Sequence, residues 1–177
     1  RWSNSYERPL DDLIALQHDL VDAMVREMGV AVTPELASRL AERKPIAPPA
    51  YEAYLRGRYF WQQRTEDGLR KAIPFFEQAI RLSPDYAAAH AGLADVYGLL
   101  PRYGTVDART GLLASKDHAL RALGLDAGLA EAHTALAKAL YTLDWNWAEA
   151  GTHFEQAIAL NPSYATARHW HSLFLMN

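Results

Sequence analysis

Apolar residues recur along this chain with the spacing that places them on one face of an α-helix. The sequence Phe-Glu-Gln-Ala-Ile occupies residues 76–80 and again residues 154–158, and in each copy Phe, Ala and Ile lie at i, i+3 and i+4. A weaker copy at 119–123 lies between them, so the offsets are 119 − 76 = 43 and 154 − 119 = 35 residues. A repeat of about 34 residues predicts a helical solenoid, and three copies are enough to bury a continuous core.

Each copy is followed by a segment that predicts a tight turn between two helices. Ser83, Asp126 and Asn161 occupy equivalent positions, and all three residue types are favourable N-caps. Pro84 and Pro162 follow two of them, at the first helical position, where a missing N–H breaks no helical hydrogen bond. We therefore expect helices to end near residues 82, 125 and 160, and new helices to begin directly after the caps.

Small residues recur where paired helices must approach closely, and the third copy carries the fullest set of repeat residues. These are Leu136, Ala137, Ala150, Phe154, Ala157 and Pro162. Over residues 50–177 the chain resembles the tetratricopeptide (TPR) repeat family. It departs from the family pattern by extra residues between the helices of the first unit and by a longer insertion at 98–110 in the second. The resemblance implies an all-α fold, a right-handed superhelix of about three and a half repeats preceded by N-terminal helices.

Two regions are expected in the chain. Residues 1–49 are predicted to form N-terminal helices and a proline-rich linker, and to be the tail of an upstream domain. Residues 50–177 are predicted to form the array, with units at about 50–83, 84–126 and 127–161 and a half unit at 162–177. The N-terminal stretch also resembles the segment that joins an effector region to a TPR array in bacterial multidomain regulators. In those proteins the effector is a winged-helix domain, a nucleotide cyclase or a protein kinase.

Composition restricts the classes of function. The chain has no cysteine, which excludes disulfides and thiolate metal sites, and its net charge of −3 gives no expectation of direct nucleic-acid binding. No apolar run approaches the roughly 18 residues of a membrane span, and no signal peptide is evident. We therefore expect a cytoplasmic fragment of a longer protein that does not insert into membranes.

Seven histidines raise a metal or catalytic hypothesis that their spacing does not support. Two pairs occupy equivalent repeat positions, which favours packing or surface roles: His90 with His133, and His118 with His153. No His-Glu-x-x-His spacing and no phosphate-binding loop are present. We expect no enzyme activity, no cofactor and no metal in this chain.

The remaining candidate site is the inner surface of the superhelix, which the resemblance assigns to the first helix of each unit. The candidate partner-binding residues are Tyr54, Arg58, Trp61, Asp95, Thr134, Lys138, Tyr141 and His169. Aromatic residues beside Arg and Lys are typical of binding hot spots, so Trp61 or Tyr54 is the expected apolar anchor. Arg58 and Lys138 favour an acidic or C-terminal segment, although Asp95 weakens that preference. The set of residues with which some TPR domains clamp a terminal carboxylate is not reproduced.

These features predict a scaffold or sensory module of a larger bacterial regulator that binds a peptide or protein partner on its concave face. The alternative is a structural module for self-association of the parent protein. The last helix has no partner helix, so we expect Trp170 or Phe174 to be covered by another copy of the chain or by the N-terminal helix. We also expect Trp145 and Trp147 to pack in an inter-helix turn, and Pro74 to cause a kink or a late helix start.

Overall fold

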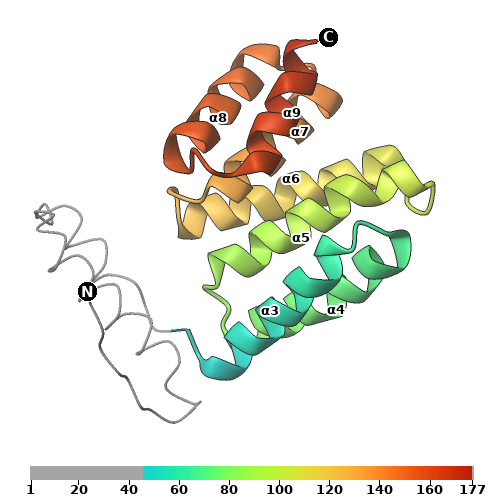
Figure 1. The fold of residues 1–177 in the computed structure, drawn as a ribbon, viewed down its shortest axis with the longest axis vertical. Helices are drawn as coiled ribbons and strands as arrows, with labels where there is room; N and C mark the ends of the chain where they lie inside the picture. Colours follow the sequence, from blue (N-terminus) through green and yellow to red (C-terminus); the bar gives the residue numbers. More distant parts are fainter. Residues whose placement is uncertain (1–45, 177) are drawn as a thin grey trace, which may run out of the picture. The chain divides into compact units, whose positions relative to one another are not determined.

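The computed structural model describes residues 46–176, which form seven α-helices and one 3-10 helix and contain no strand (Figure 1). The elements are α3 (Pro48–Gln62), α4 (Glu66–Leu82), α5 (Ala87–Leu99), η2 (Leu100–Tyr103), α6 (Ala108–Leu125), α7 (Ala130–Leu143), α8 (Trp147–Leu160) and α9 (Ala165–Leu175). The all-α prediction is confirmed. The helices expected within residues 9–43 lie outside the described residues. None of the described helices is both long and apolar enough to cross a bilayer.

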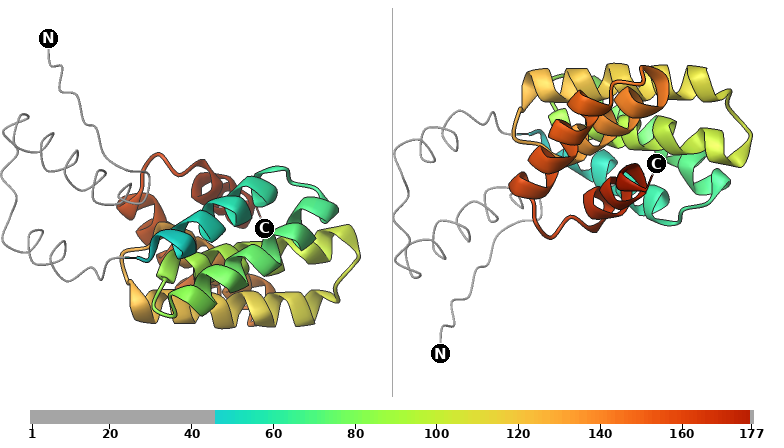
Figure 2. Two further views of the ribbon diagram at one scale, coloured as in Figure 1. Left: turned by 90° about the horizontal axis from the view of Figure 1, so that it is seen from below. Right: turned by 90° about the horizontal axis from the view of Figure 1, so that it is seen from above.

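The helices form antiparallel pairs that stack in chain order, and α9 begins a fourth pair (Figure 1). Within the stack, α5 contacts α7 and α7 contacts α9, so the first helices of the later units form one row. The second helices α4 and α6 pack between successive first helices. Viewed along the stack, α6 lies at one edge and α9 toward the opposite edge (Figure 2). Arg64, at the α3–α4 junction, lines the same hollow as Trp170 of α9, so the coiling of the stack brings its last helix close to the end of α3.

The predicted helix ends are confirmed, but the predicted helix starts are wrong. Helices end at Leu82, Leu125 and Leu160, whereas the next ones begin only at Ala87, Ala130 and Ala165. Ser83, Asp126 and Asn161 are C-caps of the preceding helices. The Asp126 carboxylate accepts a hydrogen bond from Gly128 N at 2.9 Å. The side-chain carbonyl of Asn161 accepts one from Ser163 N at 3.2 Å. These bonds close a turn before the helix, so the same residue types serve the turn and not the N-cap.

Side-chain N-caps instead begin the second helix of each unit. Thr65 Oγ1 accepts from Gly68 N at 3.1 Å, Asp107 Oδ1 from Thr110 N at 3.0 Å, and Asn146 Oδ1 from Glu149 N at 3.3 Å. Because Thr65 fixes its start, α4 runs unbroken from Glu66 to Leu82 with Pro74 inside it. The late start predicted at Pro74 is therefore wrong, and a kink there stays a prediction.

Each junction between a first and a second helix contains one residue with a left-handed backbone. These residues are Arg64, Gly104 and Trp145, with φ of 52°, 72° and 54°. Glycine adopts this conformation without steric cost, whereas a side chain at such a position is strained. Trp145 is 74% exposed, so the prediction that it packs in the turn is wrong; Trp147 does pack, 5.7 Å from the Tyr141 ring centroid.

Trp170 and Phe174 of the last helix pack within the array. Trp170 is only 9% exposed, and the Phe174 ring lies 5.7, 5.4 and 5.4 Å from those of Tyr141, Trp147 and Phe154. The N-terminal helix expected to cover them lies outside the described residues, and association with another copy stays a prediction.

Candidate functional site

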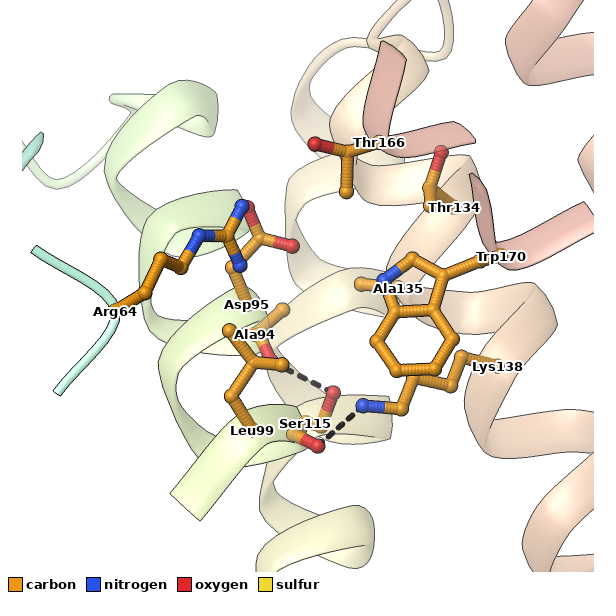
Figure 3. A pocket seen from close by; sticks show the side chains of 11 residues that line it. Arg64, Ala94, Asp95, Leu99, Ser115, Thr134, Ala135, Lys138, Thr166 and Trp170 are labelled. Carbon is orange, nitrogen blue, oxygen red and sulfur yellow. Dashed lines mark hydrogen bonds between the residues drawn. The ribbon is translucent and has the colours of Figure 1, made fainter. Parts of the chain in front are cut away.

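Two adjoining hollows lie where α9 comes close to the first and second units, and Figure 3 shows the inner one. The inner hollow is lined by Arg64, Ala94, Asp95, Gly98, Leu99, Ser115, Thr134, Ala135, Lys138, Thr166 and Trp170. The outer hollow, of about 380 Å³, is lined by Arg64, Leu99, Arg102, Tyr103, Ala165, Thr166, His169 and Trp170. Four residues line both hollows, so we treat the two as one groove. The outer hollow is its mouth, and the inner one, of only about 10 Å³, is its floor.

A buried carboxyl group lies at the floor of the groove. The Asp95 side chain is 9% exposed, and among the described residues its Oδ2 has no hydrogen-bond partner. Arg58 Nη1 lies 3.8 Å from that oxygen, which is an ion-pair distance but too long for a hydrogen bond. Burial raises the pKa of Asp95 to about 7, although the charges of Arg58 and Arg64 act in the opposite direction.

Lys138 is held by contacts within the array. Its Nζ donates a hydrogen bond to the Gly98 carbonyl and lies 4.1 Å from the centre of the Trp170 ring (Figure 3). Burial lowers the pKa of Lys138 to about 8, although the Asp95 carboxyl acts in the opposite direction. Lys138 therefore links α5, α7 and α9 at the floor, and Trp170 forms the adjoining aromatic wall.

Trp61 lies behind the groove and belongs to the core. It is 4% exposed, and the guanidinium carbons of Arg58 and Arg64 lie 4.2 and 3.8 Å from its ring centre. At these distances a cation–π attraction holds both arginines against the ring. Trp61 thus positions two groove cations.

The mouth carries cationic residues that the sequence analysis did not select. Arg102 and Tyr103 come from η2, inside the predicted insertion, and Arg64 comes from the α3–α4 junction. The Tyr103 hydroxyl donates a 2.5 Å hydrogen bond to the main-chain carbonyl of Arg64. Within residues 46–176, neither Arg64 nor Arg102 has an ion-pair partner.

The structure brings most of the predicted site residues together. Asp95, Thr134, Lys138 and His169 line the groove, and Arg58 and Trp61 lie directly behind it. Tyr54 and Tyr141 do not line it. Tyr54 packs 5.9 Å from Phe76 and 5.1 Å from Tyr86, and Tyr141 packs against Trp147, Phe154 and Phe174.

Trp170 takes the place of the expected aromatic anchor. Trp170 is the repeat equivalent of Ala135, another groove residue. The two are 170 − 135 = 35 residues apart, which is also the distance between the equivalent residues Asp126 and Asn161. That repeat relationship is the sequence signal that would have placed Trp170 in the groove.

The repeat-equivalent histidines bond the two helices of their unit to each other. The Nδ1 atoms of His90 and His118 lie 3.3 Å apart, and those of His133 and His153 lie 2.8 Å apart. His133 Nε2 lies 3.0 Å from the Ala127 carbonyl, so this nitrogen carries a proton and the Nδ1 lone pair accepts from His153. The described residues contain no group of three or more side chains able to hold a metal ion.

Comparison with solved structures identifies the fold. The Arabidopsis OM64 TPR domain matches 72% of this chain and 95% of its own, with a TM-score of 0.55 and 18% identity. The first TPR domain of human RPAP3 matches 72% of this chain and 91% of its own, with a TM-score of 0.56 and 16% identity. The array has the tetratricopeptide repeat fold. The first TPR of Spaghetti (RPAP3), solved with the HSP90 peptide SRMEEVD, is also similar, with a TM-score of 0.54.

Sequence relatives of the TPR array include regulatory proteins. The transcriptional regulator HilA of Salmonella typhimurium is 27% identical over 118 residues, which cover 67% of this chain and 21% of HilA. A Rhizobium meliloti protein named "Putative adenylate cyclase 3" is 28% identical over 93 residues, covering 52% of this chain and 16% of that protein. The chain thus spans about a fifth of the length of the curated relatives that it matches. No family model matches the chain. The predicted resemblance to TPR arrays of bacterial regulators is confirmed.

Proposed function

We propose that this TPR array is the partner-binding module of a larger regulatory protein, and that a peptide or protein segment lies in the groove. TPR folds mediate protein–protein interactions, as in the neighbour solved with a peptide. The observation that carries the proposal is the mouth of the groove, a hollow of about 380 Å³ that Trp170 walls on one side and that Arg64 and Arg102 help to line.

The size of the groove favours a segment bound in its mouth. The mouth has a volume of about 380 Å³, whereas the floor has only about 10 Å³. Trp170 forms an apolar wall for a side chain, and aromatic walls of this kind commonly anchor binding partners. Self-association is less favoured, because Trp170 and Phe174, expected to drive it, pack inside the array.

A substitution that fills the groove without disturbing the core tests the proposal. Ala165 is exposed and lines the mouth, so Ala165→Trp places a large side chain in the path of the partner. Ala148 is exposed at the start of α8 and lines neither hollow, which makes Ala148→Trp the matched control.

The measurement is capture of partners from the native host, with circular dichroism to confirm folding. We expect Ala165→Trp to lose a partner that wild type and Ala148→Trp both retain. Retention of every partner by folded Ala165→Trp means that the groove is not the binding surface.

A further inference from the structure

The insertion between α5 and α6 adds residues to the mouth of the groove. α5 ends at Leu99, and η2 then carries Arg102 and Tyr103 to the rim opposite His169 of α9. The Tyr103 hydroxyl holds the Arg64 carbonyl at 2.5 Å, which ties this insertion to the junction of the first unit. Three separate segments thereby converge on one hollow of about 380 Å³.

Arg64 occupies a backbone position that disfavours a side chain. Its φ of 52° is left-handed, and the equivalent junction of the second unit has Gly104 at a φ of 72°. Glycine forms such a turn at lower cost, so the turn itself does not require the arginine side chain. Its contribution is the guanidinium group, held 3.8 Å above the Trp61 ring and lining both hollows.

The side chains that line the mouth carry a net positive charge. The eight residues that line it include two arginines and a histidine but no carboxylate. Arg58 and Lys138, the cations selected from the sequence, have partners deeper in the groove in Asp95 and the Gly98 carbonyl. Among the described residues, Arg64 and Arg102 form no ion pair, although the Arg64 guanidinium points toward Asp95 (Figure 3). A guanidinium group matches the geometry of a carboxylate and can bind it through two parallel hydrogen bonds.

The mouth has both the charge and the room for a segment that carries carboxylates. Its volume is about 380 Å³, whereas the floor beside Asp95 has only about 10 Å³. We propose that Arg64, Arg102 and His169 bind the acidic side chains of a partner segment that lies in the mouth of the groove. This inference rests on the proposed function and names the chemistry of the partner.

The test uses fluorescein-labelled hexaglutamate as the probe, with hexaglutamine as the uncharged control and fluorescence anisotropy as the readout. Arg64→Gln and Arg102→Gln remove the two charges one at a time. Arg81→Gln, at the exposed C-terminal end of α4, removes the same charge far along that helix from Thr65. We expect each mouth variant to bind hexaglutamate about three- to tenfold more weakly than wild type, with Arg81→Gln unchanged. Added NaCl weakens the wild-type complex because the contacts lie near solvent.

Several results would overturn the inference. These are no binding of hexaglutamate, equal binding of hexaglutamine, unchanged binding by both mouth variants, or an equal loss in Arg81→Gln. Inorganic phosphate and free glutamate are tested as competitors against unlabelled hexaglutamate. If either displaces the probe at the same concentration as unlabelled hexaglutamate, the mouth holds only a single small anion and the inference is wrong.

The two proposals fail in different measurements. If Ala165→Trp loses its native partner while hexaglutamate does not bind, only the acidic character of the partner is wrong. If Ala165→Trp retains every native partner, the proposed function itself is wrong.

Discussion

The ring of Phe76 lies 2.6 Å from the point at which Gly92 would carry a β-carbon. Phe76 belongs to α4 and is fully buried, and a β-carbon at Gly57 of α3 would lie 2.7 Å from the same ring. One aromatic side chain is therefore packed against the backbones of two first helices. This packing joins the first unit to the second.

Gly92→Ala is expected to destabilise the array by about 1–3 kcal/mol, because the buried Phe76 ring has little room to move away from the added methyl group. Gly124→Ala is the matched control, since a β-carbon there meets nothing within 4 Å and alanine favours the helix. Urea unfolding measures both. An unfolding free energy for Gly92→Ala equal to that of wild type would show that the ring can shift.

The histidine pairs predict a loss of stability in acid. Burial, and the charge that His90 can carry, lower the pKa of His118 to about 4; the pKa values of His90 and His153 are also lowered, first by burial. An unfolded histidine titrates near 6.5, so the unfolded chain binds more protons between about pH 6.5 and 4. The unfolding free energy therefore falls as the pH is lowered through this window.

His118→Asn tests this prediction, because the asparagine amide can donate to His90 Nδ1 but does not titrate. Thermal unfolding at pH 7 and pH 5 is the measurement. We expect a smaller drop in melting temperature for His118→Asn than for wild type. Equal drops would mean that this pair does not contribute to the acid sensitivity.

Asp95 predicts a dependence of the opposite sign. Its pKa is raised by burial to about 7, so the folded state retains a proton that the unfolded state loses above about pH 4. The carboxyl group therefore costs stability as the pH rises from 4 through 7. The unfolding free energy of Asp95→Asn relative to wild type should increase between pH 5 and pH 8. A constant difference between the two proteins would show that Asp95 is already ionised at pH 5.

Trp145 and Trp147 should respond differently to truncation. Trp145 is 74% exposed and has a left-handed backbone, so Trp145→Gly removes strain and should leave stability unchanged or raise it by up to about 1 kcal/mol. Trp147 is 36% exposed and its ring lies 5.4 Å from that of Phe174, so Trp147→Ala should destabilise by about 1–3 kcal/mol. Thermal unfolding distinguishes them, and a larger loss for Trp145→Gly would contradict the assignment.

Local patterns predicted the repeats, and long-range geometry decided the site. The apolar spacing at 76–80 and 154–158 predicted the helices, because it is a property of neighbouring residues. The groove depends instead on the rotation between successive helix pairs, which determines how close α9 comes to Arg64. A pattern of neighbouring residues does not specify this rotation. For the same reason Trp170 was assigned to an open end of the solenoid, when it forms a wall of the groove. Ser83 and its equivalents were misplaced because the same residue types favour turns and helix N-caps.

The bond from Tyr103 to the Arg64 carbonyl has a mechanical consequence. Solenoids of stacked helix pairs can change their curvature and twist, and a concave surface then widens or narrows. Here one hydrogen bond joins two successive helix pairs at the rim, and it must break before the rim can open on that side. The rim of the proposed binding surface is therefore tied on its insertion side, beside Arg64 and Arg102.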